Sequence, residues 1–212
     1  MAQTALRLVS GATTTEPRRP EVAPTLAEGV PVGRLVELSG HGAVGRHSAA
    51  VSIVAEVQAQ GDTVAWIQVR DGGLFVPDLE DNDVCLESLV VVHVPSGAGV
   101  HGRLRATELL LRSGAFGLVV LDLDDERPAG PPAAWQGRLL GLARQYQSRV
   151  VLLSRQGKDQ PSLGPLIGLR FEPRRERVAP GRFSLQPQLL KNKSGAPFAL
   201  RADIRRAPWG LR

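Results

Sequence analysis

Short, mainly apolar runs alternate with amphipathic segments along most of the chain. The apolar runs have the length and composition of buried strands; they are Leu35–Leu38, Val64–Val69, Leu89–Val94, Leu118–Leu121 and Val150–Leu153. The segments between them place apolar residues at helical spacing; the predicted helices are His47–Gln60, Arg103–Arg112 and Pro131–Gln147. Strands that alternate with helices in this way predict an α/β fold, with a mainly parallel sheet covered by helices on both faces.

The pattern changes at both ends of the chain. From Leu166 onward the helical spacing stops, and Ile167–Phe171, Phe183–Leu190 and Phe198–Ile204 are predicted as strands of an antiparallel extension. Residues 1–25 are rich in Thr, Pro, Ala and Arg with weak periodicity, which is typical of a flexible arm. The sequence therefore predicts an arm over residues 1–25 and one domain over residues 26–212.

Length and composition support this single domain. The chain has 212 residues, of which 42% are hydrophobic, and this is enough to form a core. No stretch approaches the roughly 20 apolar residues that a membrane span needs, so we expect no membrane association. A single cysteine, Cys85, excludes a disulfide within the chain and fits a reducing cytoplasm.

Charge is distributed unevenly along the sequence. Eleven Lys and Arg face three acidic residues between Arg170 and Arg212, whereas six acidic residues and no basic ones lie between Asp71 and Glu87. A basic end suits an anionic partner such as nucleic acid, although a solvated basic surface fits equally well. The adjacent arginine pairs in this region are candidate contacts for nucleic acid or a partner: Arg174 with Arg175, and Arg205 with Arg206.

The segment from Gly40 to Ser48 has the position of a phosphate-binding loop, between a predicted strand and a predicted helix. Its glycines at 40 and 45 have the spacing of the pattern G-x-x-x-x-G-K-[ST], in which backbone amides surround the phosphates, Lys reaches their oxygens and the hydroxyl binds Mg²⁺. A glycine-rich turn without any ligand is an equally common reason for this spacing.

Two residues of that pattern are replaced in this chain. Arg46 stands in place of the Lys and keeps the charge, but its planar group is larger and is aimed differently. His47 stands in place of the hydroxyl residue and offers no oxygen to Mg²⁺, and Ser48 lies one position too late. The amides and the helix N-terminus can still hold phosphate, ATP or ADP, but Mg²⁺-dependent hydrolysis is not expected.

Three separated segments resemble the RecA family. The residues Gly29-Val30-Pro31-Val32-Gly33-Arg34-Leu35-Val36-Glu37-Leu38 are similar to the segment that leads into the RecA phosphate loop, and Leu110 to Asp122 are similar to its Walker B region. Lys191-Asn192-Lys193-Ser194-Gly195-Ala196-Pro197-Phe198 resembles its K-N-K-x-x-x-P-F segment, and Trp209-Gly210 follows where the family has tyrosine-glycine. The resemblance covers roughly Ala27 to Gly210 and implies a RecA-like core.

The resemblance also assigns residues around the phosphate loop. Asp122 matches the Walker B aspartate that organises Mg²⁺ in the family, and the catalytic glutamate falls on Arg70 or Asp71. The glutamine that senses nucleotide falls on Ser154, Arg155 or Gln156. Lysine, hydroxyl and glutamate are thus all altered, so the comparison implies a chain with no catalytic residues and no required cofactor.

Other parts of the resemblance concern contacts between subunits. Lys191 and Lys193 match lysines that reach across the RecA filament toward a neighbour's ATP; a solvated pair is the alternative. The long DNA-binding loop of RecA is reduced to about ten residues between Gln156 and Leu166, and we expect no counterpart of the RecA C-terminal domain. Self-assembly on DNA in the manner of RecA is therefore not expected.

No other catalytic or metal site is indicated by the sequence. The four histidines lack metal-ligand spacing and a cysteine partner, and no Ser/His/Asp set is supported. The three tryptophans are predicted to be packing residues.

Short RecA relatives with an altered phosphate loop resemble the ImuA family, an SOS-induced accessory of translesion synthesis. This resemblance implies a non-catalytic adaptor in the cytoplasm, at the nucleoid under DNA damage, whose partners are RecA, ImuB and, through ImuB, an error-prone C-family polymerase, with weak DNA binding at most. Two alternatives stay open: a cell-division inhibitor of the SulA type, and a weak DNA-dependent ATPase that acts as a recombinase paralogue. The K-N-K segment argues against the SulA type, because a protein that acts on a tubulin-like target has no evident use for this segment.

Overall fold

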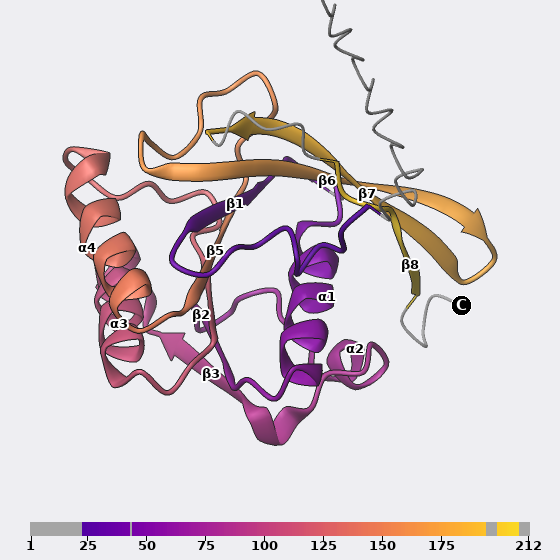
Figure 1. The fold of residues 1–212 in the computed structure, drawn as a ribbon, viewed down its shortest axis with the longest axis horizontal. Helices are drawn as coiled ribbons and strands as arrows, with labels where there is room; N and C mark the ends of the chain where they lie inside the picture. The colour runs from indigo at the N-terminus through magenta and orange to yellow at the C-terminus, as the bar shows by residue number, and fades with distance from the viewer. Residues whose placement is uncertain (1–22, 43, 194–198, 208–212) are drawn as a thin grey trace, which may run out of the picture.

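One eight-stranded sheet forms the centre of the molecule (Figure 1). The computed structural model describes residues 23–42, 44–193 and 199–207. The strand order is β3-β2-β4-β5-β1-β6-β7-β8. The strands are β1 (Leu35–Ser39), β2 (Val64–Val69), β3 (Leu89–Val94), β4 (Leu118–Asp122), β5 (Arg149–Ser154), β6 (Ile167–Ala179), β7 (Arg182–Asn192) and β8 (Asp203–Arg206).

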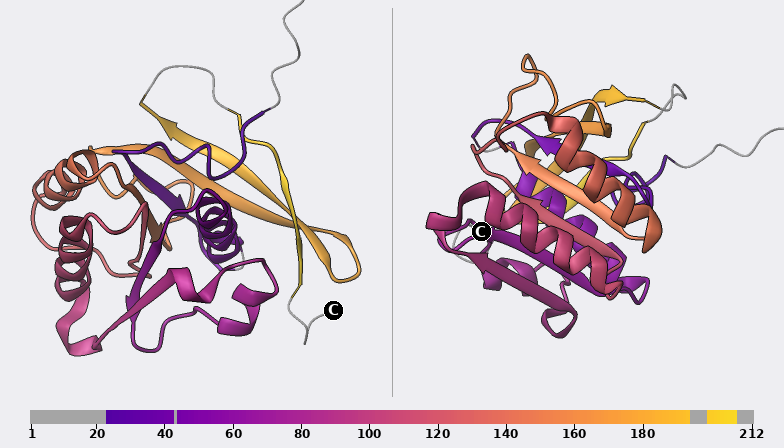
Figure 2. Two further views of the ribbon diagram at one scale, coloured as in Figure 1. Left: turned by 60° about the horizontal axis from the view of Figure 1, so that its bottom comes forward. Right: turned by 90° about the vertical axis from the view of Figure 1, so that its left-hand side faces the viewer.

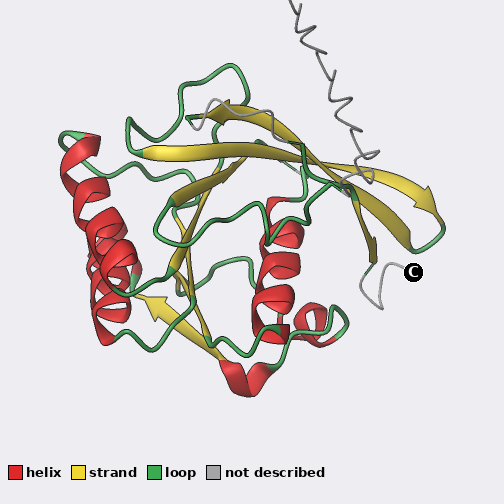
Figure 3. Ribbon diagram, viewed as in Figure 1, coloured by secondary structure: helices red, strands yellow, loops and turns green. Residues whose placement is uncertain are grey.

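Helices cover both faces of the sheet, as the sequence predicts (Figure 3). They are α1 (Arg46–Ala59), α2 (Val76–Glu80), α3 (Gly99–Ser113) and α4 (Pro132–Gln145), with short 3₁₀ turns at Leu86–Ser88 and Ser96–Ala98. Strand β4 shows why both faces are apolar: Leu118 and Val120 pack in the cluster under α1, and Val119 and Leu121 pack in the cluster under α3 and α4.

The sheet is parallel from β3 through β6 and antiparallel from β6 through β8. This confirms the predicted α/β core with a C-terminal antiparallel extension. Strands β6 and β7 are 13 and 11 residues long, so their hairpin reaches past α1 and α2 (Figure 1; Figure 2, left). The hairpin therefore forms one wall beside the phosphate loop and α2.

Several element boundaries differ from the predictions. The strand predicted over Phe198–Ile204 is wrong for 199–202, because β8 begins only at Asp203; Phe198 lies outside the described residues. The backbone N–H of Arg201 instead donates to the carbonyl of Pro24, at 3.0 Å. Helix α3 begins at Gly99 rather than Arg103, and the short helix α2 was not predicted.

The predicted arm falls largely outside the described part of the chain, which begins at residue 23. Its last residues contact the domain, because the Pro24 carbonyl accepts the Arg201 bond and the Thr25 N–H donates to Glu28 at 2.7 Å. Among the described residues, no helix has the length and apolar character needed to cross a membrane.

Candidate functional site

The phosphate loop lies at the carboxyl end of β1 and leads directly into α1, as predicted. Gly45 has φ of +87° and is packed so closely that an added Cβ would lie 2.7 Å from Leu185 of β7. Gly40 has φ of +144°, and an added Cβ there would lie 2.4 Å from Val44. Both glycines are therefore required by backbone conformation and by packing, whether or not a ligand is bound.

Arg46 is turned back across the loop and is buried. Its Nη1 donates to the carbonyl oxygen of Gly40 at 2.8 Å, and its Nη2 lies 3.7 Å from a carboxylate oxygen of Asp124. Its side chain is only 6% exposed. Burial lowers the pKa of Arg46, while the charge of Asp122 acts in the opposite direction. The cation that should meet a phosphate is thus paired with groups of its own chain.

His47 occupies the place of the magnesium-binding hydroxyl and contacts Asp122. Its Nε2 lies 2.9 Å from Oδ2 of Asp122, and Oδ1 of the same carboxylate accepts the Asp124 N–H at 2.9 Å. Burial raises the pKa of Asp122, but the hydrogen bond and charge of His47, with help from the Asp124 N–H and Arg46, outweigh it, so that the pKa lies below its usual value. Both carboxylate oxygens therefore have partners.

These residues do not fit a magnesium–nucleotide complex. Mg²⁺ needs oxygen ligands in an octahedral arrangement, but the nearest replacement for the hydroxyl is an imidazole that itself holds Asp122. Ser48 lines a neighbouring hollow with His47, and its carbonyl accepts the Ser52 hydroxyl. Within the described ranges, no group of three or more His, Cys, Asp or Glu side chains is placed to hold a metal ion.

An acidic turn after β4 adds negative charge beside the loop. Arg155 bridges two of its carboxylates, with Nε 2.6 Å from Asp124 and Nη1 3.0 Å from Asp125. Asp124, Asp125 and Glu126 line a cavity of about 160 Å³ together with His41 and Gln156. A phosphate entering here would meet carboxylates that already neutralise Arg46 and Arg155, which is unfavourable for an anion.

The other positions that the resemblance assigns to catalysis lie in different surroundings. Arg70 and Asp71, the two candidates for the catalytic glutamate, are both exposed at the end of β2. Of the candidates for the sensing glutamine, the Ser154 hydroxyl donates to Glu37 and Arg155 bridges the acidic turn. Gln156 is 5% exposed, and neither atom of its amide has a hydrogen-bond partner in the described part of the protein.

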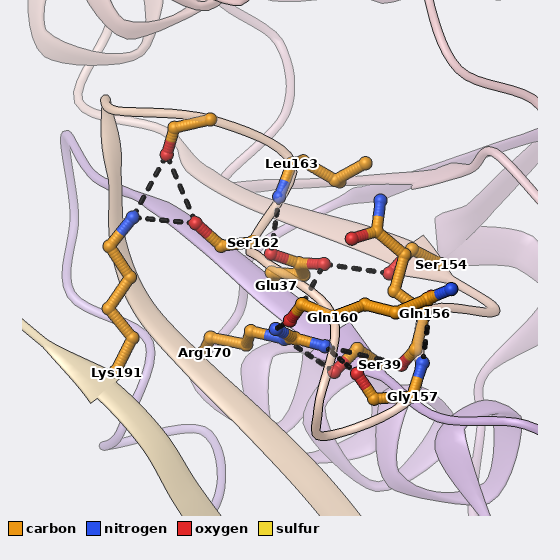
Figure 4. Close-up of polar contacts among 11 residues, drawn as sticks. Glu37, Ser39, Ser154, Gln156, Gly157, Gln160, Ser162, Leu163, Arg170 and Lys191 are labelled. Carbon is orange, nitrogen blue, oxygen red and sulfur yellow. Dashed lines mark hydrogen bonds and ion pairs between the residues drawn. The ribbon is translucent and has the colours of Figure 1, made fainter.

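The short loop between β5 and β6 is held against the sheet by Arg170 (Figure 4). Arg170 is 3% exposed, and its guanidinium donates to the carbonyls of Gln156, Gly157 and Gln160 and to the hydroxyl of Ser39. One planar group with five N–H donors thus fixes most of the turn. The loop that the RecA resemblance relates to DNA binding is therefore both short and tied down.

Glu37 balances this arginine inside the sheet (Figure 4). It is fully buried, accepts from the Ser154 hydroxyl at 2.8 Å and the Leu163 N–H at 3.1 Å, and lies 3.7 Å from Arg170. Burial raises the pKa of Glu37 above its usual value although these partners act in the opposite direction. The pair makes a buried polar network that joins β1, β5, β6 and the loop.

Lys191 and Lys193 contact the same loop of their own chain. The Lys191 Nζ donates to the Ser162 hydroxyl at 2.6 Å and to the Gly164 carbonyl at 2.9 Å, and the Lys193 Nζ donates to the carbonyl of Pro165. Burial, and then the neighbouring charge of Lys193, lowers the pKa of Lys191. The role of these lysines at a subunit boundary stays a prediction.

Comparison with known proteins agrees with this geometry. The RecA N-terminal domain family matches residues 21–150, more than half of the chain, from before β1 into β5. The chain belongs to the RecA N-terminal domain family. The RecA proteins of Ruminococcus albus and Caulobacter vibrioides are each 35% identical to it over 94 residues, and that of Fusobacterium nucleatum is 33% identical. These matches cover 44% of this chain and 23–25% of the RecA proteins, so the chain matches about a quarter of their length.

The four candidate arginines of this RecA-family chain do not form one patch. Arg174 and Arg175 are consecutive in β6 and therefore point to opposite faces of the sheet. Arg174 pairs with Glu172 at 3.5 Å, Arg205 pairs with Asp203 at 2.5 Å, and Arg175 stacks over the ring of Phe183 at 5.3 Å. Arg205 and Arg206 also line a hollow with Asp81 and Asp83 of the acidic segment.

Sequence reasoning missed the residues that close the site. Asp124 follows Asp122 in an unusually acidic run, Asp122 to Glu126, and this run was the available signal. Arg170 and Glu37 meet across 133 positions of sequence on neighbouring strands, and no local pattern indicates that pairing. The RecA family assignment supplies the register of the loop, whereas its closure by Arg46, His47 and Asp124 is visible only in three dimensions.

Proposed function

We propose that the protein is a non-catalytic RecA-like adaptor of the SOS DNA-damage response, linking RecA to a translesion synthesis complex of ImuB and an error-prone C-family polymerase. The observation that carries the proposal is the contact between His47 and Asp122, at 2.9 Å. In this position a hydroxyl would share Mg²⁺ with the carboxylate; here an imidazole takes its place. In the proposed adaptor the RecA-like fold is retained and hydrolysis is lost, because the magnesium-binding hydroxyl is replaced.

The surrounding residues support a protein that binds its partners without a cycle of ATP binding and hydrolysis. In a P-loop ATPase, nucleotide and Mg²⁺ bring cation, hydroxyl and carboxylate together, and hydrolysis releases them. In this chain Arg46 already donates to the Gly40 carbonyl and pairs with Asp124, and His47 already contacts Asp122. A surface built on this edge keeps one shape in the absence of nucleotide, which suits an adaptor.

Lys191 and Lys193 are the candidate contacts with RecA. Each ammonium has three N–H donors, and Lys193 is exposed, so that donors remain for a second molecule. In the proposed complex these lysines approach the ATP site of a true RecA at a filament end. Their contacts with residues 162–165 hold them at one edge of the sheet.

A binary interaction assay tests the proposal directly. The full chain is titrated against purified RecA on single-stranded DNA with ATP, against ImuB, and against a division protein from the same cell. We expect binding to RecA and ImuB, with RecA affinity reduced about tenfold or more by Lys191→Ala/Lys193→Ala, because lost charge contacts typically cost 1–3 kcal/mol. Lys158→Ala, an exposed lysine in the adjoining loop, is the control and leaves affinity unchanged.

The two alternatives give different results in the same assays. Binding to the division protein, with none to RecA or ImuB, would favour the SulA type. Magnesium-dependent ATP turnover that is stimulated by DNA and lost in Asp122→Ala would favour the recombinase paralogue. Either outcome would contradict the proposed adaptor function and favour the corresponding alternative.

A further inference from the structure

A groove runs from the start of α1, between α2 and the β6–β7 hairpin, to the end of that hairpin. It consists of two adjoining hollows, of about 230 and 380 Å³, which share Arg175 and Phe183 on the hairpin wall. We call this feature the α2–hairpin groove. The residues of its inner hollow come mainly from α1, α2, the hairpin and β8, and α1 and α2 lie on the side of the sheet away from α3 and α4 (Figure 1).

The inner hollow has an apolar lining that is partly open to solvent. Its apolar residues are Val51, Leu74, Phe75, Leu79 and Phe183. Leu79 is buried, but the Phe75 side chain is 59% exposed, and the adjacent Val76 is 49% exposed. A large aromatic side chain that borders a preformed hollow is typical of a surface that receives an apolar anchor from another molecule.

The wall formed by β6, β7 and β8 carries arginines that have no ion pair with another described residue. In the described residues no ion pair is found for Arg175, Arg177, Arg182 or Arg206, which all line the groove. Arg182 and Arg206 lie directly opposite each other on β7 and β8. Like charges in this position repel each other and destabilise a sheet, and an anionic group bound between the two arginines would remove this repulsion.

A carboxylate on the opposite wall helps to choose between an acidic peptide and nucleic acid. One oxygen of Asp78 is buried without a hydrogen-bond partner among the described residues. Asp81 and Asp83 line the hollow next to it, beside Arg205 and Arg206. A chain of phosphates along the groove would pass these carboxylates, whereas a peptide backbone offers N–H groups that can donate to Asp78.

We propose that the α2–hairpin groove binds an extended segment of a partner protein, with an aromatic side chain in the inner hollow and flanking acidic side chains on Arg177 and Arg182. The aromatic group packs against Phe75 and Phe183, the acids pair with the hairpin arginines, and a backbone N–H meets Asp78. The proposal identifies a docking surface for the proposed adaptor and relies on that function only for the identity of the partner.

The first test uses a defined probe, a fluorescein-labelled decapeptide of alternating glutamate and leucine around one central tryptophan. We expect saturable binding in fluorescence anisotropy, weakened about tenfold or more by Phe75→Ala and similarly by Arg177→Ala/Arg182→Ala, as for interface residues that cost at least 1.4 kcal/mol. Leu109→Ala on α3 is the matched control for Phe75, because Leu109 is equally exposed at 59%. Arg105→Ala/Arg112→Ala on α3 is the control for the loss of two exposed charges.

Further probes distinguish other occupants of the groove. A peptide with alanine in place of tryptophan, and one with lysine in place of glutamate, should each bind at least about tenfold more weakly. The proposal is overturned if a labelled thymidine oligonucleotide binds more tightly than the peptide and its binding is weakened by the same Phe75 and arginine substitutions. It is also overturned if millimolar ATP displaces the peptide, or if the α3 controls weaken binding as much as the groove variants.

The outcome separates the groove from the adaptor function. If RecA and ImuB bind, but the groove substitutions change the affinity of neither these proteins nor the peptide, the docking proposal is wrong and the adaptor function is retained. If the peptide binds in the groove but RecA and ImuB do not bind the full chain, the adaptor fails and the groove stands.

Discussion

At the scale of single residues, the loop from Gly40 to Ser48 shows how two side chains at phosphate-binding positions can contact groups of their own chain. Arg46 keeps the charge of a lysine, but its guanidinium reaches the Gly40 carbonyl and Asp124, because it is longer and has donors on two sides. His47 reaches Asp122 from the position where a hydroxyl would stand. Each side chain is thus in contact with its own chain at a position where the motif would contact nucleotide or Mg²⁺.

Reversing both substitutions should reopen the loop. In Arg46→Lys/His47→Thr the hydroxyl can share Mg²⁺ with Asp122, so we expect ATP and Mg²⁺ to stabilise this variant. At ten times the dissociation constant, binding adds about 1.4 kcal/mol and raises Tm by about 3–6 °C. Differential scanning fluorimetry measures the shift, and the further change Asp122→Asn should abolish it. An equal shift in the unchanged chain would show that its loop already accepts nucleotide.

The His47–Asp122 contact should also be visible in acid unfolding. Because the folded-state pKa of Asp122 is lowered, its contribution to stability is present above the unfolded value of about 3.9 and is lost as pH falls through the folded value. Urea midpoints between about pH 5 and pH 2 should therefore fall less steeply in Asp122→Asn than in the unchanged chain. Asp159→Asn, an exposed carboxylate, is the control. Parallel profiles for Asp122→Asn and the unchanged chain would contradict the assignment.

At the scale of secondary-structure elements, the sequence predicts the strands β1 to β5 well and the start of α3 less well. Strands β2 and β3 have the bounds that their apolar runs predict; β2 is buried along nearly all of its length, and a buried strand must be apolar throughout. Helix α3 begins four residues earlier than its pattern suggests, at Gly99. The N–H of Val100 donates to Glu126 at 3.0 Å, so a residue 26 positions away stabilises the first turn. Such a cap cannot be read from the local sequence.

The β5–β6 loop depends on one strand residue, Arg170. Arg170→Met keeps much of the side-chain length but removes the donors to three loop carbonyls and leaves Glu37 buried without its ion pair. We expect a loss of about 3–5 kcal/mol in the free energy of unfolding, the range for breaking a buried pair. Urea unfolding measures this loss. Trypsin should also cut faster at the exposed Lys158 in the freed loop.

A control on the same strand separates this effect from a general loss of charge. Arg174→Met removes an exposed arginine whose ion pair with Glu172 is worth about 1 kcal/mol or less. Its stability and its cleavage at Lys158 should stay close to those of the unchanged chain. Equal losses in both variants would mean that Arg170 does not hold the loop.

At the scale of the whole molecule, two apolar layers share one sheet. Val120 and Leu121 are neighbours in β4, yet they pack in different clusters, one under α1 and the other under α3 and α4. Every buried strand contributes to both layers in this way. A disturbance of one layer therefore reaches the other through the strands themselves, and the edge that carries the phosphate loop is supported from both faces.

This arrangement predicts one cooperative unfolding transition, which two tryptophans can report. Trp66 lies in the α1 cluster and Trp135 in the α4 cluster. In Trp209→Phe backgrounds, Trp135→Phe leaves Trp66 as the probe, and Trp66→Phe leaves Trp135. Within each of these proteins, Leu121→Ala creates a cavity only on the α4 side, which should lower the free energy of unfolding by about 2–5 kcal/mol.

The decisive comparison is the response of the remote probe. If the sheet unfolds as one unit, fluorescence of Trp66 in urea reports the same loss on Leu121→Ala as fluorescence of Trp135, although Leu121 packs on the opposite face. Circular dichroism should follow the same curve. A Trp66 midpoint that does not move would show that the two layers unfold separately. The phosphate-loop edge would then depend on the α1 layer alone, and mutations under α3 and α4 would leave it intact.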